Sequence, residues 1–223
     1  MFLHADHQQA VAVRFADAPW IGSPEPGVER KLLERDGEEV ARATSIVRYA
    51  PDSSFPQHLH ERGEELLVLE GVFSDDHGDY VAGTYVRNPP GSKHRPFSRG
   101  GCTIFVKLRQ FAPDDRARTI IGPTEGWSGD RKPLHVHRRE RVELRRLDAP
   151  ATITRDDQGI EILVVEGDVR LDRSDAPRWT WWRTPARSVE VTPLGPALLW
   201  IKSGHLDLTS SGSPDDQPRG SRR

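Results

Sequence analysis

The feature of this sequence that most constrains its fold is an internal repeat. Residues 63–71 read GEELLVLEG and residues 159–167 read GIEILVVEG, so six of the nine positions are identical. Two further segments repeat at nearly the same offset: 84–89 matches 180–185 and, after one deletion, 100–107 matches 195–202. Self-similarity at a fixed spacing indicates two copies of one structural unit. We therefore predict two domains of the same design.

Each copy consists of short apolar segments separated by turn-forming residues. The chain contains 19 glycines and 18 prolines, and no long segment has the apolar period of a helix. We expect β-strands at residues 42–49, 65–70, 79–86 and 102–108. Tight turns are expected at residues 76–79 and 99–101. The pattern predicts an all-β protein.

The repeat also suggests where the domains begin and end. We predict a first domain over residues 1–111, a linker over 112–132 and a second domain over 133–208. The linker contains the turn-rich segments APDD and GPTEG. Residues 209–223 are rich in serine, glycine, proline and arginine, which is typical of a disordered tail.

Composition excludes several classes of partner and location. The formal net charge of −2 over 223 residues argues against attraction to nucleic acid or anionic membranes by overall charge. The apolar segments are too short to span a membrane, and the N-terminus lacks the pattern of a signal peptide. Cys102 is the only cysteine, so no intrachain disulfide can form. We expect a cytoplasmic protein.

A cluster of potential metal ligands lies in the first copy. His58 and His60 stand two residues apart, so both side chains project from one face of a strand. Glu64 follows closely, and His94 lies on a later segment. We predict that these four residues bind one divalent metal ion per chain. Imidazole suits zinc, iron and nickel, and a carboxylate also admits manganese. Glu65 is an alternative carboxylate, but it should point to the opposite face of the strand.

The second copy has lost all four of these residues. At the corresponding positions the sequence carries Thr154, Asp156, Ile160 and Glu190. None of the four changes preserves the ligand set. We therefore predict that the second domain keeps the fold without the metal and contributes structure, a pocket wall or a partner surface.

The first copy resembles a cupin. The first cupin motif is matched by His58, His60, Glu64 and Gly71, although Asp52 stands at its opening glycine. The second motif is matched by Gly83, Pro89, Gly91 and His94, with Ser98 in place of its asparagine. The resemblance implies two tandem cupin barrels, each a double-stranded β-helix or jelly roll.

Within the cupins, the chain is most similar to the ChrR-like group. The similarity lies in two segments, GEELLVLEGVFSD at residues 63–75 and RNPPGSKH at residues 87–94. This resemblance implies a zinc site at the four ligand positions and a regulatory role like that of ChrR anti-sigma factors, which respond to oxidative stress. The sequence contains no Cys-x-x-Cys motif, which ChrR proteins carry in the helical domain that holds the sigma factor. We therefore expect a regulatory protein partner other than a classical sigma factor.

The expected function is a regulatory or stress-sensing module with a small ligand in the first barrel. Two other functions are compatible with the same ligands. One is a metal-dependent dioxygenase or related oxidoreductase, in which iron, manganese or nickel keeps open positions for oxygen and a small organic substrate. Tyr85 and Arg87 would then orient an anionic substrate. The other is a sugar- or metabolite-binding protein. A homodimer would protect exposed sheet edges.

Several remaining residues receive structural interpretations. His135 and His137 form a second His-x-His pair, for which an exposed strand is favoured over an accessory metal site. His4 and His7 are expected at the surface, and Cys102 is expected to be a small buried apolar residue rather than a redox sensor.

The aromatic and basic clusters also have simple explanations. Trp179, Trp181 and Trp182 are expected to pack in a core or interface. A group of arginines suggests either an anion or partner patch or one solvated strand face; its members are Arg138, Arg139, Arg141, Arg145 and Arg146.

Overall fold

The computed structural model describes residues 1–38, 40–155, 159–206 and 208. The described residues contain β-strands and turns without any helix, which confirms the all-β prediction. In particular, none of them lies in a helix that is long and apolar enough to cross a membrane. The expected disordered tail, 209–223, lies outside the described residues.

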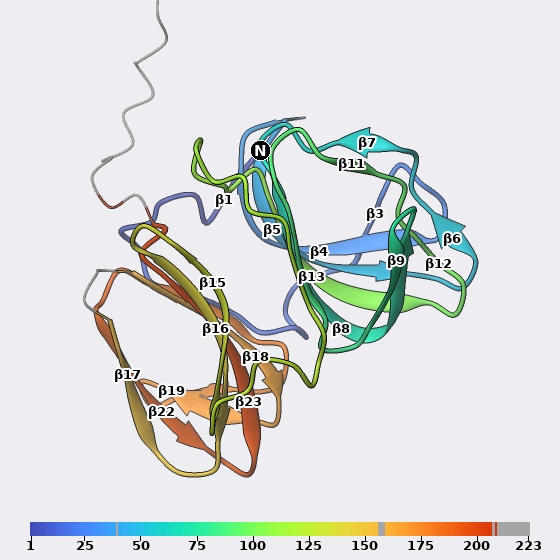
Figure 1. The fold of residues 1–223 in the computed structure, drawn as a ribbon. Helices are drawn as coiled ribbons and strands as arrows, with labels where there is room; N and C mark the ends of the chain where they lie inside the picture. Colours follow the sequence, from blue (N-terminus) through green and yellow to red (C-terminus); the bar gives the residue numbers. More distant parts are fainter. Residues whose placement is uncertain (39, 156–158, 207, 209–223) are drawn as a thin grey trace, which may run out of the picture.

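The first half of the chain forms one large sheet and one small one (Figure 1). The small sheet pairs β7 (His58–Leu59) with β11 (Lys93–His94). The large sheet has eleven strands: β1 (Phe2–Leu3), β3 (Ile21–Gly22), β4 (Val28–Asp36), β5 (Arg42–Tyr49), β6 (Ser53–Ser54), β8 (Glu64–Asp75), β9 (Gly78–Val81), β10 (Tyr85–Asn88), β12 (Phe97–Ser98), β13 (Cys102–Leu108) and β14 (Thr119–Ile121).

The second half forms two sheets, the first of which also contains β2 (Val11–Val13) from near the N-terminus. The other five strands of this six-stranded sheet are β15 (Arg131–His137), β16 (Glu140–Leu147), β18 (Ile160–Glu166), β21 (Trp181–Thr184) and β23 (Ala197–Ser203). The second has four strands: β17 (Ala151–Thr154), β19 (Val169–Leu171), β20 (Ser174–Ala176) and β22 (Ser188–Pro193).

The expected strands agree with the structure except at one place. Residues 42–49 and 102–108 are strands with the predicted bounds, and 65–70 lies within β8. The predicted strand over 79–86 is wrong, because a turn divides it into β9 and β10. Gly83 sits in this turn with a φ of +84°, a conformation that favours glycine.

The repeat is visible in the backbone as well as in the sequence. Strands β8, β10 and β13 correspond to β18, β21 and β23. Gly71 and Gly167 have φ angles of +73° and +72°. A Cβ atom at Gly71 would lie 2.2 Å from the carbonyl oxygen of Gly101, and one at Gly167 would lie 2.4 Å from that of Pro196. Both copies therefore need glycine for the same close approach of two strands.

The two halves exchange strands. Strand β2, near the N-terminus, pairs with β21 of the second half, so that Val13 lies opposite Trp181. Strand β14 falls within the segment predicted as a linker and pairs with β10 of the first half. The predicted limits at 1–111, 112–132 and 133–208 do not include these two pairings. Each strand has only three residues, which is too short to give a clear pattern in the sequence. These domain limits stay a prediction.

Apolar side chains form three buried clusters. One lies within the first half and includes Cys102, and another fills the second half. The third joins the two halves: Leu67 and Phe105 from the first pack with Trp181 and Trp200 from the second. Trp179 belongs to the same cluster and Trp182 packs against that of the second half, which confirms the predicted packing role of the tryptophans. The interface between the halves is thus as well buried as a domain core.

Buried ion pairs cross this interface in a symmetric way. The Lys107 ammonium lies 2.6 Å from a Glu161 carboxylate oxygen, and the Lys202 ammonium lies 2.5 Å from a Glu65 carboxylate oxygen. All four side chains are nearly inaccessible to solvent. Lys107 and Lys202 occupy equivalent positions in the two copies, as do Glu65 and Glu161. Each copy therefore supplies one lysine and one glutamate to the ion pairs with the other copy in the same chain.

The single cysteine of the chain is buried, as predicted. Cys102 is buried in the cluster of the first half, and its burial raises the pKa of the thiol to about 11. A thiol of this kind is protonated and inert near neutral pH.

Candidate metal centre

The structure brings the four predicted ligands together. His58 lies on β7 and is paired with His94 on β11, which places both imidazoles on one small sheet. His60 follows β7 in the loop that leads to β8, and Glu64 is the first residue of β8. One ligand atom from each of the four residues lies within 4.8 Å of all the others. No second group of this kind occurs among the residues that the structure describes.

Each histidine is oriented by an oxygen at its Nδ1 atom. The acceptors are the carbonyl oxygen of Pro56 for His58, at 2.9 Å, the hydroxyl of Ser92 for His60, at 3.0 Å, and the carboxylate of Asp75 for His94, at 2.9 Å. The Ser92 hydroxyl donates its own proton to the carbonyl of Pro89, so it can accept from His60. An imidazole that donates Nδ1–H keeps Nε2 as the free lone pair, and a metal ion takes this tautomer.

Two of these Nε2 atoms are buried without a hydrogen-bond partner, namely those of His60 and His94. They lie 3.5 and 3.4 Å from one carboxylate oxygen of Glu64, beyond a good hydrogen bond. The same oxygen accepts a hydrogen bond of 3.0 Å from the Asn88 amide. Buried nitrogens without partners are rare in folded proteins. A divalent cation among these atoms would satisfy both, so the donor set fits a metal ion.

Electrostatics also prepare the cluster for a cation. Burial acts to raise the pKa of Glu64, but His60, His94 and the Asn88 hydrogen bond together hold it below its ordinary value. Glu64 is therefore ionised near neutral pH. Burial lowers the pKa of His60, which favours its neutral, ligating form. Burial acts to lower the pKa of His94 too, but Asp75 and Glu64 raise it, so a metal ion at His94 would compete with a proton.

The first half of the chain resembles a known family. Residues 8–112 match the sequence model of the ChrR cupin-like domain. These residues form a cupin domain. No curated protein sequence matches the chain.

Solved structures with this cupin fold come from several bacteria. YlbA from Escherichia coli superimposes with a TM-score of 0.71 and 13% sequence identity, covering 91% of this chain and 94% of its own. The bacterial pirin YhhW from E. coli, solved with nickel(II), gives 0.69 and 12%, covering 87% and 98%. A proposed dioxygenase from Nostoc punctiforme gives 0.69 and 14%, covering 92% and 85%. At these identities the likeness concerns the fold.

The two departures from the cupin motifs are accommodated locally. Asp52 replaces the opening glycine of the first motif and has a φ of +59°, in the left-handed region. Aspartate tolerates this conformation better than most residues. Ser98 replaces the asparagine of the second motif, and its hydroxyl donates to the carbonyl of Val72 at 2.7 Å.

Two residues proposed to orient a substrate lie elsewhere, so that hypothesis is wrong. Tyr85 and Arg87 are buried on the face of β10 that meets the second half, where the Tyr85 hydroxyl donates to Glu65 at 2.8 Å. The Arg87 guanidinium donates to Glu65 at 3.1 Å and to Asp115 at 2.6 Å. Glu65 therefore faces away from the metal cluster, as its position on the strand predicted.

The histidines outside the cluster are more buried than expected. The prediction of an exposed strand is wrong for His135, which is buried with Nε2 2.9 Å from an Asp115 carboxylate oxygen. Its neighbour His137 is half-buried beside Asp114. The surface prediction holds for His4 and is wrong for His7, which is buried against Arg42. These contacts join different segments of the chain, and a strand pattern does not reveal them.

Sequence analysis missed three residues that support the ligands. Asp75 ends β8 and holds His94, and it also accepts hydrogen bonds from Tyr80 and the backbone of His77. Ser92 and Asn88 lie between the glycine and histidine of the second cupin motif. Their position inside this motif was a usable signal, as was that of Asp75 at the end of the ChrR-like segment 63–75.

The contact between Asp75 and His94 leads to a testable prediction. We expect Asp75→Asn to weaken metal binding by about 10- to 100-fold, because ligand-supporting carboxylates typically have effects of this size. Competition with a chromophoric chelator measures the affinity. Asp79→Asn is the matched control, since Asp79 contacts Ser74 and does not contact the cluster. An unchanged affinity in Asp75→Asn would show that Asp75 does not tune the centre.

Proposed function

We propose that this protein is a zinc-binding regulatory cupin whose ion is held by His58, His60, Glu64 and His94. The observation that carries the proposal is the pair of buried Nε2 atoms, on His60 and His94, that face the Glu64 carboxylate without hydrogen-bond partners. Bound zinc would supply a closed, charged centre that fixes the loop between β7 and β8 and the β11 segment.

The number of protein ligands favours zinc over an octahedral ion. Four protein ligands close a tetrahedral site, which is typical of structural rather than catalytic zinc. An octahedral ion held by the same four residues would need two further ligands.

The regulatory part of the proposal is supported by the ChrR cupin-like match and by the second half. At the positions of Glu64 and His94 the second half has Ile160, which is fully buried in its apolar cluster, and Glu190, which is exposed. One metal-binding barrel and one apolar barrel suit a module that senses a small molecule or oxidant and transmits the change to a protein partner.

A second candidate function is a metal-dependent dioxygenase. It is favoured by the exposure of His58, which is only half-buried while the other three ligands are buried. The cluster is therefore most accessible at His58, where a small molecule could reach the ion. Iron, manganese or nickel at this centre would keep open positions for substrate and oxygen.

Elemental analysis distinguishes the two functions. The protein is purified without chelators or a nickel column and examined by inductively coupled plasma mass spectrometry. About one zinc per chain, with no oxygen consumption in the presence of small diketones, thiols or organic acids, is the expected result. Stoichiometric iron or manganese with substrate-dependent oxygen consumption would replace the regulatory proposal by the enzymatic one. A protein without stoichiometric metal would contradict both.

A further inference from the structure

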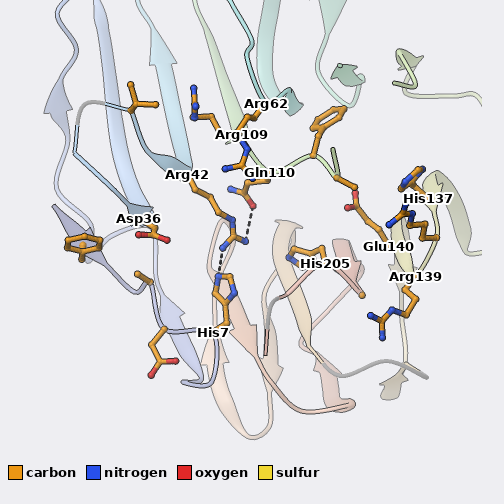
Figure 2. A pocket seen from close by; sticks show the side chains of 18 residues that line it. His7, Asp36, Arg42, Arg62, Arg109, Gln110, His137, Arg139, Glu140 and His205 are labelled. Carbon is orange, nitrogen blue, oxygen red and sulfur yellow. Dashed lines mark hydrogen bonds between the residues drawn. The ribbon is translucent and has the colours of Figure 1, made fainter. Parts of the chain in front are cut away.

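A second potential site, lined by none of the four metal ligands, lies in the cleft between the two halves. The cleft has a volume of about 1080 Å³, which is large enough for a small organic molecule. Five arginines line it: Arg42, Arg62, Arg109, Arg138 and Arg139. Figure 2 shows Arg42, Arg62 and Arg109 together on one side, with Arg139 and His137 across the cleft. Both halves thus contribute positive charge to one cavity, in which the five arginines outnumber the three lining carboxylates of Asp6, Asp36 and Glu140.

Part of this charge is available to a ligand. Arg62 is exposed and forms no ion pair or side-chain hydrogen bond with any residue that the structure describes. Arg109 pairs with Glu61, and Arg138 pairs with Asp114, but these carboxylates are 60% and 48% exposed. Such exposed pairs contribute little energy, so an anion in the cleft can compete for the guanidinium groups.

Arg62 is held in place by its neighbours in the chain. Gly63 has a φ of +78°, and a Cβ atom there would lie 2.4 Å from the ring of Phe111. The backbone nitrogen of Phe111 also donates to the carbonyl oxygen of Arg62 at 3.3 Å. The turn that carries Arg62 is therefore packed tightly against the wall of the cleft, so its backbone needs no further ordering when the side chain binds a ligand.

Independent evidence for a ligand comes from His205, which lies between His7 and Glu140 in the cleft (Figure 2). Its side chain is only 3% exposed, and Nε2 lies 2.7 Å from Glu161. Its other ring nitrogen, Nδ1, is buried without a hydrogen-bond partner. Burial lowers the pKa of His205 to about 4, so near pH 7 the ring is neutral. With the proton on Nε2, Nδ1 is a hydrogen-bond acceptor.

We propose that the cleft binds a small hydroxylated organic anion. The arginines bind its carboxylate or phosphate groups, and Nδ1 of His205 accepts a hydrogen bond from its hydroxyl group. Arginine suits either anion, because its planar donors match carboxylate and phosphate oxygens alike. The hydroxyl requirement follows from the buried acceptor, which a ligand without a donor would leave unsatisfied.

Isothermal titration calorimetry of the full chain with defined probes tests this proposal. Racemic malate and succinate differ by one hydroxyl group, and glycerol 3-phosphate replaces the carboxylates by a phosphate. We expect saturable binding of malate or glycerol 3-phosphate, whichever head group the arginines prefer, and about tenfold weaker binding of succinate than of malate. No saturable binding of any probe up to about 10 mM would overturn the proposal.

Variants locate the binding within the cleft. Arg62→Gln is expected to weaken binding of the preferred probe about tenfold, since it removes a charged hydrogen-bond donor. The control is Arg170→Gln, because Arg170 forms an exposed pair with Asp175 on β19 and β20 outside the cleft. His205→Phe should bind malate no better than succinate. Equal weakening in Arg62→Gln and Arg170→Gln, or an unchanged malate preference in His205→Phe, would contradict the assignment.

Discussion

Replacing His60 with alanine is expected to abolish stoichiometric metal binding. The variant removes one of the two buried Nε2 donors that face Glu64, and the lost affinity should exceed the 10- to 100-fold effect of a supporting residue. The metal should also stabilise the folded state, because it binds the folded chain and not the assembled ligands of an unfolded one. Metal at about 1,000 times its dissociation constant contributes about 4 kcal/mol.

Thermal unfolding with and without chelator measures this contribution. For a chain of this length, about 4 kcal/mol corresponds to a change in Tm of about 10 °C. The wild-type protein should lose this amount on removal of its metal, whereas His60→Ala should start at the lower Tm and not respond to chelator. His137→Ala is the matched control, since His137 belongs to a His-x-His pair without a nearby metal cluster. A His60→Ala protein with full metal content would contradict the assigned ligand set.

The second large effect is expected at the buried ion pairs between the halves. Glu161 accepts hydrogen bonds from Lys107, at 2.6 and 2.8 Å, and from the indole of Trp181, at 2.6 Å. In Glu161→Gln the amide oxygen can still accept from Trp181 and Lys107, which share one carboxylate oxygen in the native protein. The amide NH₂ would replace the other oxygen, which accepts from Lys107 and His205, and the buried Lys107 ammonium would lose its carboxylate counter-charge. We expect the free energy of unfolding to fall by about 3–5 kcal/mol.

A double variant distinguishes the loss of an ion pair from the burial of a lone charge. Lys107→Met combined with Glu161→Gln removes the charge left without its partner, and most of the lost stability should return. Chemical denaturation at pH 7 measures both variants. Asp175→Asn, which breaks the exposed pair with Arg170, should leave stability nearly unchanged. If the single and double variants were equally destabilised, the lone-charge explanation would fail.

The same ion pairs show what the sequence could have revealed and did not. Glu65, Arg87 and Lys107 are identical to Glu161, Arg183 and Lys202 in the second copy. These charged identities lie at the interface between the halves, where each copy must satisfy the other. Such identities indicate a common fold, but they do not by themselves reveal that the two copies pack against each other. The substrate role expected for Tyr85 and Arg87 fails for this reason, because both residues lie at the interface.

The metal cluster was easier to predict because its geometry is local. His58 and His60 share one side of a short extended segment, and the alternation of side chains along β8 separates Glu64 from Glu65. The supporting contact from Asp75 to His94 depends instead on how two distant segments pack. The burial of His7 and His135 likewise depends on contacts with other segments, namely Arg42 for His7 and Asp115 for His135.

The exchange of strand β2 has a consequence for how the chain folds during synthesis. Val13 pairs with Trp181, which is added to the growing chain 168 residues later. At a synthesis rate of roughly 5–20 residues per second, this interval is roughly 10–30 s. The first half therefore leaves the ribosome with β2 unpaired, and the six-stranded sheet closes only after β21 and β23 have been synthesised. Folding of the two halves is coupled in time as well as in space.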